Sequence, residues 1–115
     1  SIPEKNLQAM AEELCANLGV RFFRIPDKLL SYLKMNATTW VRVFVARYLA
    51  GVPDLMLFKA LPDGRNEVLF LEIKTEAGKL SLSQQKWHSG LTVKISYGWE
   101  ETERIIKEFA VLSTP

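Results

Sequence analysis

A chain of 115 residues holds enough apolar side chains for one compact domain, which we expect to span residues 1–115. Its one cysteine and one histidine exclude an internal disulfide, a structural zinc site, a two-histidine metal site and a Cys/His nucleophile pair. Acid–base or metal chemistry must therefore rest on carboxylates and lysines. The net charge of +2 is too small to indicate a nucleic-acid partner, and no apolar stretch approaches the ~20 residues of a membrane-spanning helix.

The first half of the chain is expected to be mainly helical. Residues 3–18 carry apolar side chains at helical spacing, and Gly19 is typical of the position just after a helix. A short strand over 20–25 and a helical turn over 27–33 come next. For residues 39–50 the 3.6-residue period favours a helix, although many residues there are β-branched.

The second half combines strands and helices. Two strand-like segments, 54–61 and 67–75, flank the turn-rich Pro62–Asn66 and predict a hairpin. A helix over 81–91, a strand over 93–97 and a helix over 99–111 are expected to follow. This order predicts an α/β domain with a mixed β-sheet flanked by helices.

Three charged residues of the hairpin are the candidates for chemistry. Glu72 and Lys74 alternate with Ile73, so both project from the same face of the second strand. In one even register Asp54 lies opposite Lys74, and in a register shifted by two residues it lies opposite Glu72. Either gathers the three side chains on one face, whereas an odd register sends Asp54 to the other face unless a bulge corrects it.

Two carboxylates and a lysine in one cleft suit metal-assisted hydrolysis of a phosphodiester. Asp54 and Glu72 offer hard oxygen ligands that fit Mg²⁺, and the backbone carbonyl of Ile73 is a further candidate ligand. The cation would polarise the phosphodiester and lower the pKa of a bound water. Lys74 would orient that water or stabilise the developing negative charge.

A longer run of residues carries a family resemblance. It consists of Gly51-Val52-Pro53-Asp54-Leu55, then Glu72-Ile73-Lys74-Thr75, then Gly78-Lys79-Leu80-Ser81 with Gln84 and Trp87. The run resembles the VRR-NUC family, the virus-type replication and repair nucleases of the PD-(D/E)XK superfamily. The resemblance implies a restriction-endonuclease-like core and Mg²⁺- or Mn²⁺-dependent cutting of structured DNA. Small stand-alone members resemble dimeric Holliday-junction resolvases, and a bacterial or phage-infected cytoplasm is the expected location.

The resemblance also implies a role for each matching residue. Asp54 and Glu72 become metal ligands, Lys74 the catalytic lysine and Gln84 a further residue at the active site. Glu4 resembles a first-helix glutamate that completes the metal site. Residues 1–60 carry a net charge of +3, so a positive cleft is compatible with the small total charge. Candidate contacts to the DNA backbone are Arg42, Arg47, Thr75, Lys79, Ser81 and Lys86.

Each of these residues also has a plainer interpretation. Asp54 suits a turn or the start of a strand, and Glu72 with Lys74 suits a cross-strand ion pair on a solvated face. Gln84 follows Ser81 at the spacing of a capping box, a role that does not exclude a place in the active site.

The aromatic and sulfur-bearing residues are assigned structural roles. Trp40, Phe44 and Tyr48 are expected in the core or in a dimer interface rather than in a base-stacking platform. Cys15 and His88 are expected to be structural or surface residues.

Other functions stay open beside a dimeric Holliday-junction resolvase. These are a flap- or nick-type structure-specific nuclease, a catalytically inactive DNA-binding module of the same fold, and a protein-interaction domain with a fortuitous motif.

Overall fold

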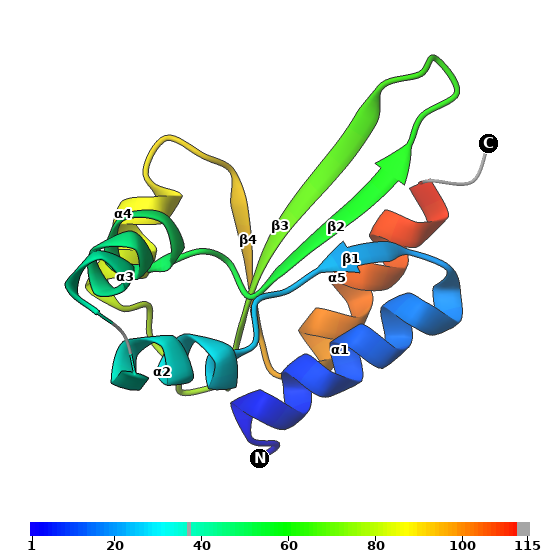
Figure 1. The fold of residues 1–115 in the computed structure, drawn as a ribbon. Coiled ribbons are helices and arrows are strands. Elements are labelled where there is room, and N and C mark those ends of the chain that lie inside the picture. The colour runs from blue at the N-terminus through cyan, green and yellow to red at the C-terminus, as the bar shows by residue number, and fades with distance from the viewer. Residues whose placement is uncertain (37, 113–115) are drawn as a thin grey trace.

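The computed structural model describes residues 1–36 and 38–112. Figure 1 shows a sheet of order β1-β2-β3-β4. The first three strands, β1 (Arg21–Phe23), β2 (Leu55–Ala60) and β3 (Asn66–Lys74), pair antiparallel, and β4 (Val93–Tyr97) joins β3 in parallel. The helices are α1 (Glu4–Leu18), α2 (Asp27–Asn36), α3 (Thr39–Phe44), α4 (Leu82–His88) and α5 (Trp99–Leu112), and a π-helical turn, η1 (Val45–Leu49), continues α3. The predicted mixed sheet flanked by helices is confirmed, and it is consistent with a restriction-endonuclease-like core.

The register of the β2–β3 hairpin is the feature that positions the site. Leu55 pairs with Leu71, so the residues one step further toward the open end are Asp54 and Glu72. This is the second of the two even registers. It places the two carboxylates next to each other and Lys74 one strand position beyond them.

The turn of the hairpin is shorter than the predicted Pro62–Asn66 segment. The Leu61 N–H donates to the Arg65 carbonyl at 2.8 Å, which leaves three loop residues between them. Gly64 closes the loop with a φ of +90°, a conformation that glycine adopts without strain. The shorter loop selects the register, because the pair that closes the loop fixes every later pair along the strands.

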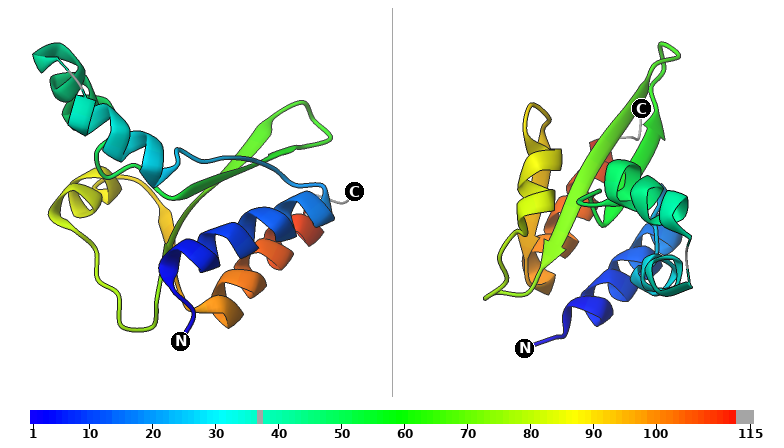
Figure 2. Two further views of the ribbon diagram at one scale, coloured as in Figure 1. Left: turned by 60° about the horizontal axis from the view of Figure 1, so that its bottom comes forward. Right: turned by 60° about the vertical axis from the view of Figure 1, so that its left-hand side comes forward.

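Helices α1 and α5 lie side by side and cover one face of the sheet (Figures 1 and 2). In β3, Leu71 and Ile73 are fully buried against these helices, and alternation along the strand sends Glu72 and Lys74 to the opposite face. Cys15 is among the buried core residues, as expected. The helices contribute Leu7, Ala11, Cys15, Ile105, Ile106 and Phe109 to this core.

Helix α4 lies on the other face of β3, and α2, α3 and η1 lie on the same side of the molecule as α4 (Figure 1). The ring of Trp87 in α4 packs edge-on against Phe70 of β3, with 5.5 Å between the ring centroids. This contact brings α4 against the face that holds Glu72, which is fully buried there. None of the described helices is long and apolar enough to cross a membrane.

Several element boundaries differ from the prediction. The strand expected over 20–25 is limited to β1, and the helical turn expected over 27–33 is a full helix that reaches Asn36. The helix expected over 39–50 changes to a π turn after Phe44, where the Ala50 N–H donates to the Val45 carbonyl at 2.9 Å. The helix expected over 81–91 ends at His88, because the backbone of Ser89 is extended.

The aromatic residues of α3 and η1 are not part of the core. Trp40 is 70% exposed, and Phe44 and Tyr48 are also exposed, with their rings tilted against each other. The expectation that they fill the core is wrong, and a dimer interface remains as their predicted role.

Candidate active site

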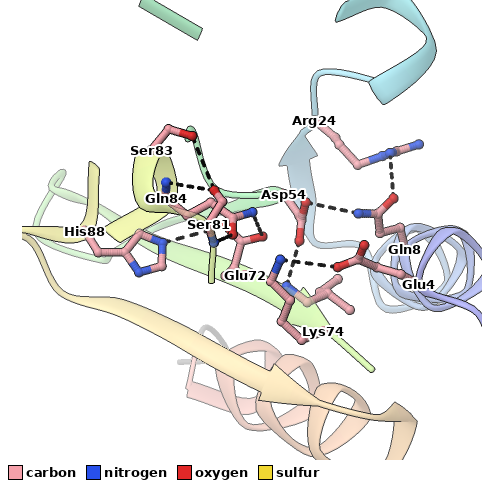
Figure 3. A network of polar contacts seen from close by, with 11 residues as sticks. Glu4, Gln8, Arg24, Asp54, Glu72, Lys74, Ser81, Ser83, Gln84 and His88 are labelled. Carbon is pink, nitrogen blue, oxygen red and sulfur yellow. Dashed lines mark hydrogen bonds and ion pairs between the residues drawn. The ribbon is translucent and has the colours of Figure 1, made fainter. Parts of the chain in front are cut away.

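Asp54, Glu72 and Lys74 converge at the open end of the β2–β3 hairpin (Figure 3). Glu72 is completely buried and Lys74 is only 8% exposed. The plainer interpretation of these two residues as an ion pair on a solvated face is therefore wrong. Burying charged groups costs free energy unless they have partners, so the contacts of each group are described in turn.

The Asp54 carboxylate is held by two donors from distant parts of the chain. The Ile73 backbone N–H donates to Asp54 Oδ2 at 2.8 Å, and Gln8 Nε2 of α1 donates to Asp54 Oδ1 at 3.0 Å. Both donors fix the carboxylate against rotation. Asp54 is thus more than a turn residue, because its side chain connects β3 to α1.

A polar stripe on α1 supports this side of the site. Glu4, Gln8 and Glu12 are spaced four residues apart and project from the same side of the helix. Arg24 forms an ion pair with Glu12 and donates from Nη1 to Gln8 Oε1 at 3.3 Å. Since the Gln8 oxygen accepts from Arg24, the Gln8 amide nitrogen must face Asp54 (Figure 3).

Glu4 contacts the lysine rather than the carboxylates. Its Oε1 lies 3.6 Å from Lys74 Nζ, a distance that marks an ion pair. Glu4 thus lies beside the cluster, but the contact it makes there is with Lys74, and its predicted role as a metal ligand stays a prediction.

Glu72 is the most perturbed group of the site. Burial, then contact with Asp54 and its charge, raise the pKa of Glu72 from 4.5 to about 10, although the nearby Lys74 ammonium acts in the opposite direction. The buried Glu72 carboxyl therefore resists ionisation unless a cation neutralises its charge.

Helix α4 provides two side chains that approach Glu72 from the other side. Gln84 donates from Nε2 to Glu72 Oε2 at 3.3 Å, while its Oε1 accepts from the Ser81 N–H at 2.8 Å. The capping box is confirmed, and the same glutamine also contacts Glu72, so the cap does not exclude a place beside the carboxylates. His88 Nε2 lies 3.6 Å from Glu72 Oε1, which places this half-buried histidine against the carboxylate rather than at the surface.

The donor set fits a hard divalent cation. Two carboxylates whose charges repel each other in a buried setting favour a cation between them, and Mg²⁺ characteristically uses one or two carboxylates together with water and phosphate oxygens. Within residues 1–36 and 38–112, no group of three or more His, Cys, Asp and Glu side chains is arranged to hold a metal ion. Of the predicted ligands, Asp54 and Glu72 lie next to each other, and the backbone N–H of Ile73 contacts Asp54.

A small cavity of about 150 Å³ opens onto this cluster. Asp54, Gln84, Gly51 and Lys34 of α2 are among the residues that line it. Gly51 has a φ of +80°, and a Cβ there would lie 2.1 Å from the Ser83 carbonyl oxygen. This close approach of the loop to α4 keeps Gln84 in reach of Glu72.

The predicted DNA contacts divide into two groups. Arg47 and Lys86 line one groove of about 590 Å³ between η1 and α4, so residues 39 positions apart in the sequence share one surface. Ser81 caps α4 beside the site, Thr75 and Lys79 lie on the loop between β3 and α4, and Arg42 is exposed on α3. Lys79, Ser81 and Lys86 are likewise exposed, whereas Thr75 is half-buried.

The sequence analysis missed Gln8, Arg24 and His88 as residues of the site. For Gln8 a signal existed, because it lies one helical turn after Glu4 on the edge of the apolar face of α1. His88 likewise lies one helical turn after Gln84. Arg24 carried no local signal, since its contacts depend on how β1 crosses α1.

A mixed sheet that brings two carboxylates and a lysine to the end of a hairpin defines a nuclease site of the PD-(D/E)XK class. The VRR-NUC domain matches residues 31–94, which is more than half of the chain, and the chain belongs to this family. At the level of reaction class the protein is a nuclease, a hydrolase for which DNA is the indicated substrate. Nucleases of this type generally depend on a divalent metal. Neither the curated proteins nor the solved structures include a significant match to the chain.

Proposed function

We propose that the protein is a Mg²⁺- or Mn²⁺-dependent DNA endonuclease that hydrolyses phosphodiester bonds in structured DNA. The observation that carries the proposal is the buried cluster of Asp54, Glu72 and Lys74, together with the raised pKa of Glu72. Buried titratable groups with strongly shifted pKa values are typical of functional sites. A bound cation would offset the repulsion between the Asp54 and Glu72 carboxylates.

In this proposal the site residues have distinct tasks. Asp54 and Glu72 hold the cation, with the Ile73 carbonyl as a further oxygen ligand. When bound, the cation supplies Lewis-acid polarisation of the phosphodiester and activates water. Lys74, kept near the site by Glu4, provides a positive charge for the negative charge that develops on the phosphate.

The amide side chains position the two ligands. Gln8 and Gln84 each donate one hydrogen bond to one carboxylate, and neither brings a charge of its own. Removing an amide of this kind leaves a ligand free to rotate, so both are positioning residues in the proposed reaction.

The basic side chains of the groove between η1 and α4 suit a phosphate backbone. Arg47 and Lys86 line this groove, and Ser83 belongs to both its wall and that of the cavity at Asp54. A DNA strand laid along the groove would therefore pass next to the cavity whose wall includes Asp54. Contacts of this kind position the backbone without reading sequence, as expected for an enzyme that recognises DNA shape.

A Holliday-junction-resolving homodimer is the form of this function that we favour. Symmetric cutting of a four-way junction needs two active sites, and a two-fold dimer provides them. Exposed apolar side chains on α2, α3 and η1 support a dimer interface, since monomeric proteins rarely expose large apolar patches. They include Leu29, Met35, Trp40, Val43, Phe44 and Tyr48. The proposed location is the cytoplasm of a bacterial or phage-infected cell.

Two alternatives make different predictions for the same experiment. A flap- or nick-type nuclease cuts those substrates in preference to a four-way junction. A catalytically inactive DNA-binding module binds DNA without cutting it, but the presence of both carboxylates and Lys74 argues against this alternative.

The test is cleavage of labelled four-way, flap, nicked and linear DNA in Mg²⁺, Mn²⁺ or EDTA. We expect the protein to cut the four-way junction in either metal and to be inactive in EDTA. Asp54→Asn and Lys74→Ala should reduce cleavage by about 10³-fold or more, within the range for removing central catalytic groups. Lys94→Ala, which removes an exposed lysine of β4, is the matched control for Lys74→Ala and should retain activity. Cleavage that persists in EDTA or in either site variant contradicts the proposal.

A further inference from the structure

Two buried polar atoms face each other beside the carboxylate cluster. Within the described part of the chain, Glu72 Oε1 and His88 Nε2 are the buried side-chain atoms without a hydrogen-bond partner, and they lie 3.6 Å apart. A buried polar atom without a partner is unfavourable for folding, so a pair of such atoms in contact calls for an explanation.

His88 Nε2 is the nitrogen that lies against the unpaired Glu72 Oε1. Gln84 donates to the other oxygen, Oε2. Lys74 pairs with Glu4, and the two donors near Asp54 are used by Asp54. His88 is on the opposite side of Glu72 from Lys74, with its ring directed at the carboxylate (Figure 3).

Helix geometry explains how His88 comes to this position. Gln84 and His88 are four residues apart in α4, so both project from the same side of the helix toward Glu72. The neighbouring Trp87 ring packs on Phe70 and fixes how close α4 approaches β3. A shift of a few tenths of an ångström in either side chain brings the two atoms into hydrogen-bond distance.

We propose that His88 is a positioning residue that donates a hydrogen bond from Nε2 to Glu72 Oε1 and thereby orients Glu72 as a ligand for the divalent cation. This inference rests on the proposed function, because it assigns a role toward the same metal site. The neutral imidazole with its proton on Nε2 is the form that donates without adding charge. Ligating carboxylates are typically held by such outer hydrogen bonds, and loss of one weakens metal binding by about 10–100-fold.

The substitutions that test the inference separate the donor from the volume of the side chain. His88→Phe keeps a ring and removes the donor, whereas His88→Gln places an amide N–H near the position of Nε2. Binding of Mg²⁺ or Mn²⁺ alone is measured by titration calorimetry, and the melting temperature in EDTA reports folding. Ser89→Ala, at an exposed position next to His88, is the control.

We expect His88→Phe to weaken binding of both metals by about 10–100-fold and His88→Gln to restore it to within a few-fold of wild type. Cleavage should need correspondingly more metal in His88→Phe and should recover in part at saturating metal. A purely structural role predicts instead that both variants lower the melting temperature and leave metal affinity unchanged, and that result overturns the inference.

A second measurement avoids any dependence on a folded variant. His88 is the only histidine in the chain, so nitrogen-15 NMR of the wild-type imidazole reports this ring alone. We expect the proton on Nε2 in the presence of Mg²⁺, and a proton on Nδ1 overturns the inference. A wild-type protein that neither binds metal nor cuts DNA contradicts the proposed function. Normal wild-type behaviour with an unaffected His88→Phe contradicts only the role of His88.

Discussion

Replacing Glu72 with glutamine is expected to stabilise the protein in the absence of metal while abolishing its activity. The substitution keeps the size of the side chain and its hydrogen-bond acceptor for Gln84, but it removes the acid that burial and Asp54 oppose. Residues placed for catalysis often destabilise the fold, so a substitution that stabilises the protein there commonly lowers its activity.

The size of the effect follows from the raised pKa. In the unfolded chain Glu72 loses its proton near pH 4.5, whereas in the folded, metal-free protein it keeps the proton until about pH 10. The contribution of Glu72 to stability is therefore complete below pH 4.5 and is lost as pH rises toward 10. The loss accumulates at about 1.4 kcal/mol per pH unit, which gives up to about 3 kcal/mol at pH 7. For a chain of this length that corresponds to up to roughly 12 °C in Tm.

The assay is denaturant or thermal unfolding of the wild type and Glu72→Gln in EDTA between pH 5 and pH 9. We expect the two proteins to be closest at pH 5 and the variant to be increasingly the more stable as pH rises. Excess Mg²⁺ should stabilise only the wild type, by about 2.7 kcal/mol at a hundredfold excess over Kd, and so reduce the gap. Glu13→Gln, which alters an exposed carboxylate of α1, serves as the control and should follow the wild type.

Either of two results would refute this prediction. If the stability difference between the wild type and Glu72→Gln in EDTA does not change with pH, Glu72 is not a buried acid that resists ionisation. A variant less stable than the wild type at pH 8 leads to the same conclusion.

The remaining predictions concern metal affinity, the supporting contacts and assembly. Because the cation replaces the proton on Glu72, affinity for Mg²⁺ should rise with pH between 6 and 8. Calorimetry that shows no pH dependence contradicts this. Gln8→Leu should weaken Mg²⁺ binding by about 10-fold with little loss of fold, and Gln8→Glu should not restore it, since a carboxylate cannot donate to Asp54. Gly51→Ala should destabilise the protein by about 1–3 kcal/mol and lower cleavage, because its φ of +80° and the nearby Ser83 carbonyl leave no room for a Cβ; Gly90→Ala, at a similar φ but in open space, should keep cleavage intact. Trp40→Glu should convert a dimer to monomers in sedimentation experiments, and a wild type that is monomeric at micromolar concentration excludes the dimer altogether.

The amino-acid sequence determined the order of the elements and the face on which the chemistry lies. Alternation along a strand is a local property, so Glu72 and Lys74 had to share a face whatever packed around them. The capping box at Ser81 was equally local, because its two hydrogen bonds join residues only three positions apart. These features, with the family resemblance, were enough to identify a nuclease.

Only the tertiary structure decided how the site is closed. Two even registers agreed with the sequence, and the three-residue loop before Arg65 selected the one that sets Asp54 beside Glu72. The partners that hold the two carboxylates, Gln8 on α1 and His88 on α4, come from helices packed near opposite sides of the cluster. Their contacts depend on how those helices meet the sheet, which is set by long-range packing and not by spacing along the chain. For the same reason the burial that raises the pKa of Glu72 became visible only in the folded protein.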